Sequence, residues 1–123
     1  MKRWLPILIA LTTACGGAQT TTTTTASSTP RIVGVCSTPA LGVCQIYYEG
    51  EADLDGAQDA CTNSQVPGTS GAWLASCPTD ARLGDCADAS GVVQARFYSG
   101  STQYPDLTSA ENACEADSGT WVP

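Results

Sequence analysis

Residues 33–50 read VGVCSTPALGVCQIYYEG, and the same pattern returns in residues 83–100 as LGDCADASGVVQARFYSG. The two segments align without a gap, and glycine, cysteine, valine and tyrosine recur in the same order. The sequence therefore predicts a unit of about 45 residues that occurs twice along the chain. Two further blocks match after a difference in length: DLDGAQDAC (53–61) with DLTSAENAC (106–114), and GAWL (71–74) with GTWV (119–122).

Each unit is predicted to fold as strand, strand, helix and strand. VCQIYY (43–48) and VVQARFY (92–98) are rich in β-branched and aromatic residues, which is typical of strands. RIVGVC and ARLGDC, just upstream, are expected to fold back on them as hairpins, and AWLAS and TWV to return as short strands. The predicted fold class is α+β, as one small disulfide-rich domain of two tandem strand–strand–helix–strand repeats.

The helix of each unit carries a start signal. Asp55 is followed three positions later by Gln58, and Thr108 by Glu111, which is the spacing of a capping box. We therefore expect the two helices to begin at Asp55 and Thr108. Both helices would be only two to three turns long, so we expect a disulfide to hold each one to its strand.

The two units differ on one strand face. Side chains alternate along a strand, which places Gln94, Arg96 and Tyr98 together on a face that we expect to be wet. In the first unit Ile46 stands where the second has Arg96. We expect the WLASC segment to cover that more apolar face.

The repeat also sorts the seven cysteines. The cysteines shared by both units are expected to pair within each unit, and the two that occur only in the first unit pair by elimination. Zinc is not expected, because the closest spacings exceed those of zinc sites and the chain has no histidine. The predicted disulfides are Cys36–Cys61, Cys86–Cys114 and Cys44–Cys77.

The N-terminus, MKRWLPILIALTTAC (1–15), has a basic pair, a short apolar stretch and small residues before Cys15. This is the pattern of a secretory signal peptide over residues 1–14. LTTAC resembles the lipobox of bacterial lipoproteins, although Thr12 stands where that family usually has leucine. The resemblance implies cleavage before Cys15, a lipid on this cysteine, and an exported protein anchored in the cell envelope, at the outer membrane or cell surface.

The alternative is ordinary cleavage after Ala14, which would leave Cys15 without a lipid. The odd number of cysteines favours lipidation, because it leaves six for disulfides. Residues 15–30 contain a run of threonines and cannot bury apolar surface, so we expect a disordered tether. The first repeat is assigned to 31–77 and the second to 78–123, and together they are expected to form one folded domain.

The net charge of the chain limits the classes of partner that we expect. From Cys15 onward the chain has three arginines, no lysine and no histidine against twelve acids, a net charge of −9. Such a chain is not expected to bind nucleic acid or to dock on anionic lipid through a basic patch. The lipid would then be its only membrane contact, and we expect a monomer whose partner is an envelope protein or a glycan.

The stretch EGEADLDG (49–56) is the weak candidate for a metal site. Glu51, Asp53 and Asp55 alternate before a glycine, as acids do at the start of a calcium loop. The twelfth position from Glu51 is Thr62, however, and such loops require a bidentate glutamate there. The favoured interpretation is a solvated acidic loop before a helix.

Aromatic residues supply the binding candidates, which are Tyr104, Tyr48 and Tyr98. They can form a platform for a sugar or an anchor for a protein partner, or simply fill the core of a small domain. Tyr104 has no counterpart in the first unit and lies beside Pro105, so we expect it to be the most exposed of the three.

Catalysis is not expected. The chain has no histidine, and it has no lysine beyond the signal peptide. The common triads and Schiff-base chemistry are therefore excluded. Oxidised cysteines are not nucleophiles. We expect a lipid-anchored extracytoplasmic binding or structural module without a cofactor. The alternatives are a carbohydrate- or cell-wall-binding domain, a calcium-dependent adhesion module and, least favoured, a small hydrolase.

Overall fold

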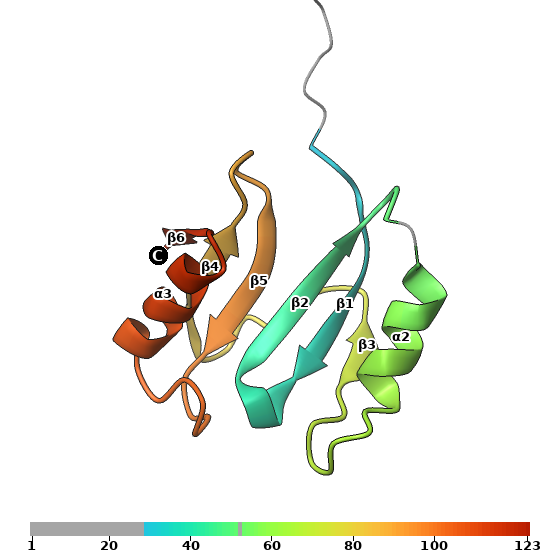
Figure 1. Ribbon diagram of the computed structural model, residues 1–123, viewed down its shortest axis with the longest axis horizontal. Coiled ribbons are helices and arrows are strands. Elements are labelled where there is room, and N and C mark those ends of the chain that lie inside the picture. The colour runs from blue at the N-terminus through green and yellow to red at the C-terminus, as the bar shows by residue number, and fades with distance from the viewer. Residues whose placement is uncertain (1–28, 52) are drawn as a thin grey trace, which may run out of the picture.

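The structure is a computed structural model, and it describes residues 29–123 with the exception of residue 52. A 3-10 turn, Pro39–Leu41, joins the first two strands. The elements confirm a small disulfide-rich α+β fold. In chain order they are β1 (Ile32–Thr38), β2 (Val43–Tyr48), α2 (Leu54–Thr62), β3 (Ala72–Leu74), β4 (Arg82–Ala87), β5 (Val93–Tyr98), α3 (Leu107–Ala116) and β6 (Thr120–Val122) (Figure 1).

The six strands form one antiparallel sheet in the spatial order β3-β1-β2-β5-β4-β6. Each half of the sheet contains a hairpin, β1–β2 or β4–β5, with a short third strand on its outer edge. In the part of the chain that the structure describes, β2 and β5 are the strands that join the halves. Their paired residues are Val43 with Phe97, Cys44 with Arg96, and Gln45 with Ala95.

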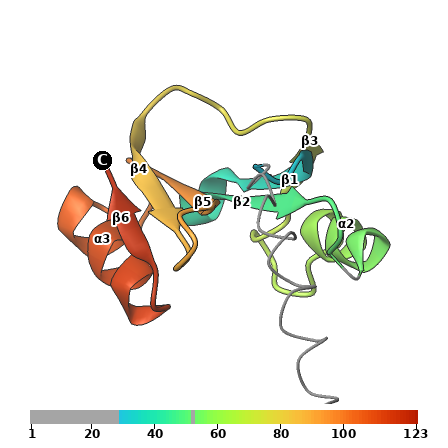
Figure 2. The ribbon, with the colours of Figure 1, turned by 90° about the horizontal axis from the view of Figure 1, so that it is seen from above.

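Both helices lie on the same side of the sheet, one at each end, and the connection from β3 to β4 crosses the other side (Figure 2). Because side chains alternate along a strand, Val43, Ala95 and Phe97 point toward the helices, whereas Cys44 and Arg96 point away. We call these two sides the helix face and the helix-free face.

Three disulfides join elements that are distant in sequence, with Cα–Cα distances between 5.6 and 5.9 Å. Two of them attach each helix to the first strand of its own half. The third attaches the β3–β4 connection to β2 on the helix-free face. The pairs are those that the sequence predicts: Cys36–Cys61, Cys86–Cys114 and Cys44–Cys77.

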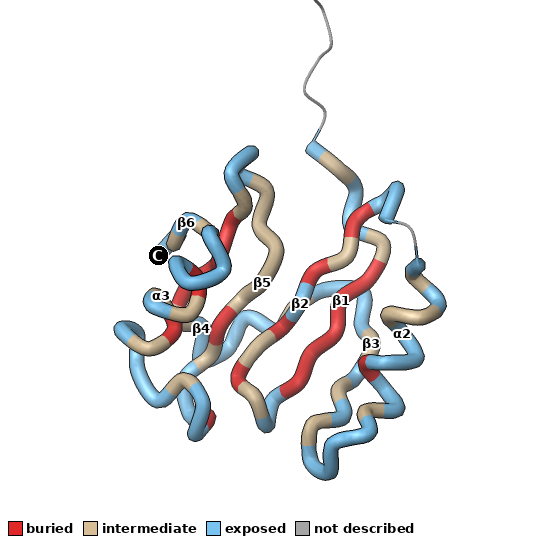
Figure 3. Tube along the Cα trace, viewed as in Figure 1, coloured by how far each residue is buried: buried red, intermediate tan, exposed pale blue. Residues whose placement is uncertain are grey.

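The buried residues lie mainly on the strands (Figure 3), and they form two small clusters rather than one large core. The cluster on the helix-free face is centred on the first half, and the cluster on the helix face is centred on the second half. In both clusters half-cystine side chains fill positions that larger apolar residues occupy in bigger domains. The clusters are Val35, Cys44, Ile46 and Tyr48, and Cys86, Phe97, Ala110 and Cys114.

A tryptophan covers a glycine in each half. Trp73 of β3 lies over Gly34 of β1, and Trp121 of β6 lies over Gly84 of β4, so closely that a Cβ at either glycine would overlap the indole ring. The two edge strands have only three residues each. Contact between an indole ring and bare backbone therefore helps to hold edge strands that are too short to be stable by pairing alone.

The helices begin two residues earlier than the sequence predicts, so Asp55 and Thr108 as N-caps were wrong. Asp53 caps α2 and accepts a hydrogen bond at 2.9 Å from the backbone N–H three positions on. Asp106 caps α3 and forms a capping box with Ser109. The short aspartate side chain reaches the exposed backbone N–H groups directly. Asp55 instead places its charge in the first helical turn, where the helix dipole favours it.

The disulfides should dominate stability, because the two core clusters are small. Replacing both Cys86 and Cys114 by alanine is expected to lower the free energy of unfolding by about 3 to 4 kcal/mol, the contribution of a loop of this length in the chain-entropy model. Urea unfolding followed by circular dichroism measures this change. Non-reducing peptide mapping gives the pairing directly. A thermal melt that reductant leaves unchanged would contradict the stabilising role of the disulfides. A peptide in which Cys36 is linked to Cys44 would contradict the pairing.

Candidate functional site

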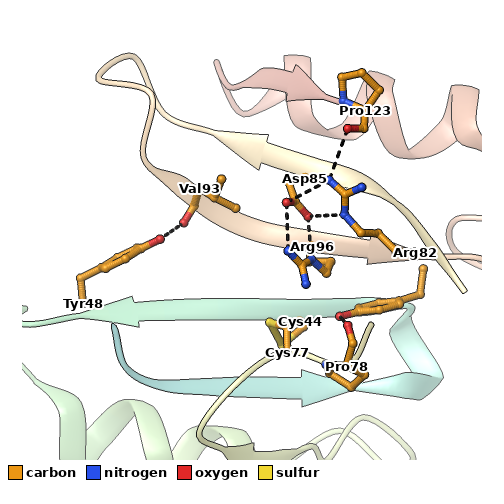
Figure 4. Close-up of polar contacts among 10 residues, drawn as sticks. Cys44, Tyr48, Cys77, Pro78, Arg82, Asp85, Val93, Arg96 and Pro123 are labelled. Carbon is orange, nitrogen blue, oxygen red and sulfur yellow. Dashed lines mark hydrogen bonds and ion pairs between the residues drawn. A yellow bond between two sulfur atoms is a disulfide. The ribbon is translucent and has the colours of Figure 1, made fainter. Parts of the chain in front are cut away.

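On the helix-free face a buried aspartate lies between two arginines (Figure 4). Asp85 Oδ1 accepts hydrogen bonds from Arg96 Nε at 2.8 Å and from Arg82 Nε at 3.2 Å. Its Oδ2 lies 3.1 Å from Arg96 Nη2 and 3.1 Å from Arg82 Nη2. Arg82 Nη2 also donates to the main-chain oxygen of Pro123 at 3.4 Å. One side-chain carboxylate is thus shared by two guanidinium groups, and these three side chains together carry a net charge of +1.

The local backbone brings these three side chains to one face. Asp85 and Arg96 are directly paired in the β4–β5 ladder. Arg82 lies three residues before Asp85, and in a regular strand the two side chains would point to opposite faces. The register shifts between Arg82 and Gly84, and this irregularity returns Arg82 to the face of Asp85.

The ion pairs keep Asp85 charged. Burial alone would raise the pKa of this carboxyl, because it disfavours the charged form. The hydrogen bonds and charges of Arg96 and Arg82 outweigh burial and hold the pKa of Asp85 below its ordinary value of 3.8. The hydrogen bond to Asp85 in turn raises the pKa of Arg96. The cluster is therefore fully ionised at neutral pH.

The predicted binding candidates Tyr48 and Tyr98 also lie on this face, but both hydroxyls are engaged. Tyr48 is buried, and its hydroxyl donates to the carbonyl oxygen of Val93 on β5. The Tyr98 hydroxyl donates to the carbonyl oxygen of Pro78 at 2.6 Å. Burial is the main cause that raises the pKa of both tyrosines. They fasten β2 and the β3–β4 connection to β5 rather than presenting a free hydroxyl.

The expectation that Gln94, Arg96 and Tyr98 share a wet face was wrong at Gln94, which lies toward the helix face, and at Arg96. The side chain of Arg96 is 24% exposed and is held by Asp85, which is itself 8% exposed. Cys44, which pairs with Arg96 in the β2–β5 ladder, is fully buried, and its disulfide to Cys77 lies beside the cluster (Figure 4). This face is therefore an ion-pair network packed against a disulfide.

A cavity of about 720 Å³ opens on the helix-free face next to this network. Its polar end is formed by Asp85 and Arg96, and the aliphatic part of its wall includes Ile32, Ile46 and Val92. Its volume lies within the range of pockets that take small molecules. The remaining lining residues are Thr29, Pro30, Tyr48, Ser90, Gly91 and Val93.

A second cavity, of about 340 Å³, lies on the helix face between β5 and the end of α3. Tyr104 is in its wall and packs edge-on against Phe97, with ring centroids 4.9 Å apart. Tyr104 is half-buried, as is Tyr98, whereas Tyr48 is buried. Gln45, Gln94 and Asp88 also line this cavity, and Gln94 Nε2 donates to Asp88 Oδ2 at 2.9 Å. It offers an aromatic surface beside several hydrogen-bonding groups.

The acidic stretch serves local structure. Glu51 accepts a hydrogen bond from the backbone N–H of Tyr48 at 3.0 Å, and Asp53 caps α2. Asp55 is exposed in the first turn of α2. Within residues 29–123, residue 52 apart, no three histidine, cysteine, aspartate or glutamate side chains gather into a group that could hold a metal ion.

Both cavities are lined by charged, polar and apolar residues. The six cysteines among the described residues are all in disulfides and offer no thiolate. Asp85 is held ionised by two arginines, which makes it a poor proton donor at neutral pH. Charge, hydrogen bonding and apolar contact are what these surfaces provide.

The signal peptide, Cys15 and nearly all of the threonine-rich tether lie outside the described residues. Among the residues that are described, neither α2 nor α3 is long and apolar enough to cross a membrane. The three disulfides are consistent with an exported protein, since such bonds persist mainly in oxidising compartments.

Comparison of the chain with protein-family models, with curated proteins and with solved structures finds no match in any of the three.

The ion-pair network was not predicted from the sequence. Asp85 and Arg96 are eleven positions apart, and the register shift that brings Arg82 to the same face leaves no clear mark in the sequence. The alignment of the two units contains one indication of the network. All three of its charged residues stand opposite apolar residues of the first unit, which are Ile32, Val35 and Ile46.

Asp85 makes stability depend on pH. A carboxyl whose folded-state pKa is depressed stabilises the fold above its unfolded-state pKa, and this contribution is lost as the pH falls through the folded-state value. We expect Asp85→Asn to lower the free energy of unfolding by about 1 to 3 kcal/mol at pH 7, because the arginines lose their anion. The difference from wild type should shrink below pH 4. Urea unfolding between pH 2.5 and 7 measures both effects.

The matched control is Asp80→Asn, which removes an exposed carboxylate in the β3–β4 connection. It should change stability by less than about 0.5 kcal/mol at pH 7. Equal losses in the two variants would show that Asp85 has no special role.

Proposed function

We propose that the protein is an exported binding module, tethered to a membrane of the cell envelope through a lipid on Cys15. Three disulfides in so small a domain support export, and the lipobox-like LTTAC sequence supports the anchor. The threonine-rich segment would then separate the folded part from the membrane, by at most about 50 Å if fully extended.

We also propose that the folded part consists of two copies of one unit. Each half has the same order of elements, strand, strand, helix and strand, and a helix-to-strand disulfide. The tryptophan-over-glycine contact occurs in both halves, at Trp73 on Gly34 and at Trp121 on Gly84. An aspartate followed by leucine begins each helix. These shared details support duplication of an ancestral unit.

The observation that carries the binding function is the cavity around Tyr104. Its wall contains Cys86 and Cys114, whose disulfide joins β4 to α3, so the wall is held in place before any ligand arrives. Preorganisation of this kind reduces the entropy lost on binding. A site on a rigid scaffold without a nucleophile supports recognition rather than catalysis.

A glycan is the ligand class that this cavity favours. Tyr104, which packs on buried Phe97, provides aromatic surface for the apolar side of a sugar ring, and exposed Gln45 provides a polar partner for hydroxyl groups. Asp88 and Gln94 also line the cavity, but they are hydrogen-bonded to each other, and Asp88 Oδ1 accepts from Ser90 and Val92. No arginine lines this cavity in the described part of the chain. An acidic protein partner is disfavoured because the described chain has three arginines against twelve acids.

A glycan array of cell-wall fragments tests the site. Tyr104→Ala is expected to weaken binding of any captured glycan by about tenfold or more, since truncating an aromatic anchor costs about 1 to 2 kcal/mol. Gln58→Ala, on the exposed surface of α2, should bind like wild type. Thermal melts of both variants show whether they are folded. Undiminished glycan binding by folded Tyr104→Ala would place the ligand elsewhere.

The anchor is tested separately by the intact mass of protein purified from cell membranes. We expect a chain that begins at Cys15 and carries acyl groups, and Cys15→Ser should release the protein into the soluble fraction because the anchor is lost. A mature chain with an unmodified Cys15, or a Cys15→Ser variant that stays in the membrane, would exclude lipidation as the means of attachment.

A further inference from the structure

The first half of the sheet provides an internal comparison for the Arg82–Asp85–Arg96 network. Val35 pairs with Ile46 in the β1–β2 ladder at the register where Asp85 pairs with Arg96 in the β4–β5 ladder. Val35 is fully buried and Ile46 nearly so. Two apolar side chains thus occupy the positions of the Asp85–Arg96 ion pair, in which the aspartate is buried and the arginine is partly exposed.

Arg82, the third member of the network, also has an apolar counterpart in the first half. Ile32 pairs with Tyr48 as Arg82 pairs with Tyr98, and in both strands the register shifts just after this residue. The hairpin therefore forms with isoleucine or with arginine at this position. The architecture of the hairpin does not require the charges of the second half.

Stability alone is a weak reason for the network. Removing Asp85 from water, and the arginines in part, costs free energy that their attraction offsets incompletely, and apolar replacements of buried ion pairs are often as stable or more stable. The first half shows that the apolar replacement is available to this hairpin. The charges are better explained by something that they bind.

The network carries more positive charge than its own anion neutralises. The four close contacts of Asp85 come from Arg82 and Arg96 together, so one positive charge remains. Only one other arginine, Arg31, stands in the described part of the chain, which has no lysine and no histidine. Two of the three cations of an acidic domain are thus gathered at one point.

The cavity of about 720 Å³ meets this surplus charge at Arg96. Arg96 Nε and Nη2 are directed to Asp85, and the side chain keeps 24% of its surface in contact with solvent. A guanidinium that is held in place on one side can present its remaining N–H groups to a planar oxyanion on the other. Next to it the wall is aliphatic, formed by Ile32, Ile46 and Val92.

We propose that this cavity binds an oxyanion carried on an apolar body, namely an alkyl carboxylate or alkyl phosphate. The head group lies against Arg96, whose charge Arg82 preserves by sharing Asp85. The apolar body lies along Ile32 and Ile46. The site is on the opposite face of the sheet from the Tyr104 cavity, so it goes beyond the proposed glycan function and is tested independently of it.

Ligands that share a body and differ in the head group test the site. Octanoate, octyl phosphate and octylammonium are titrated by calorimetry into the purified exported protein with its disulfides intact. The two anions are expected to bind and octylammonium is not. Inorganic phosphate should bind at least about tenfold more weakly than octyl phosphate, because it forgoes the aliphatic contact.

Two variants of equal charge separate the site from the overall field of the protein. Arg96→Gln is expected to weaken octanoate binding by about 10- to 100-fold, since a charged hydrogen-bonding partner is lost. Arg31→Gln removes the same charge outside the cavity and should bind like wild type. The triple variant R82I/D85V/R96I copies the first half and should fold, with an unchanged circular dichroism spectrum, but should not bind.

Absence of binding by octanoate and octyl phosphate at millimolar concentration would overturn the proposal. So would equal affinity for octylammonium, or a folded Arg96→Gln variant that retains wild-type affinity. Inorganic phosphate that binds as tightly as octyl phosphate would exclude the aliphatic wall as part of the site. If the triple variant does not fold, the comparison of Arg96→Gln with Arg31→Gln still shows whether the anion binds at Arg96.

Discussion

The pairing of β2 with β5 is the interaction on which the rest of the structure depends. Three residue pairs in this ladder turn two small three-stranded halves into one sheet, and the Tyr48 hydroxyl adds a bond from β2 to the β5 backbone. The same pairing sets Cys44 against Arg96, so that a disulfide and an ion-pair network share the helix-free face. Both cavities contain residues of β2 and β5, and neither would exist if the halves were separate.

The disulfides make so small a sheet practicable. Each half buries few large apolar side chains, and short helices and three-residue edge strands are weak by themselves. Covalent links from helix to strand replace the core that a larger domain would have. Because the disulfides provide much of the stability, neither face of the sheet has to be fully covered by apolar side chains. The result is a rigid frame with the Tyr104 cavity on the helix face and, on the helix-free face, a cavity with an aliphatic wall and Arg96 at its end.

The two halves show how one backbone accommodates different side chains. At the register where the first half buries Val35 against Ile46, the second pairs buried Asp85 with Arg96, which is partly exposed. The backbone is kept by features that both halves have: the register shift after the first strand residue, the glycine under tryptophan, and the aspartate cap of the helix. The side chains at these paired positions on the helix-free face do not form any of these shared features. The two halves can therefore differ there in charge and in exposure.

The sequence by itself determined the order of the elements, the α+β class and the partners of the six cysteines, because each follows from local pattern or from short stretches that resemble one another in the two halves of the chain. It misplaced the helix caps by two residues, since Asp53 and Asp106 act through backbone groups whose direction the pattern does not show. Only the tertiary structure decided that Arg82, Asp85 and Arg96 meet, that Tyr48 and Tyr98 are bonded to backbone, and that Tyr104 borders a cavity. These contacts depend on a register shift and on the docking of two hairpins, and such long-range geometry is not encoded in any short stretch of the chain.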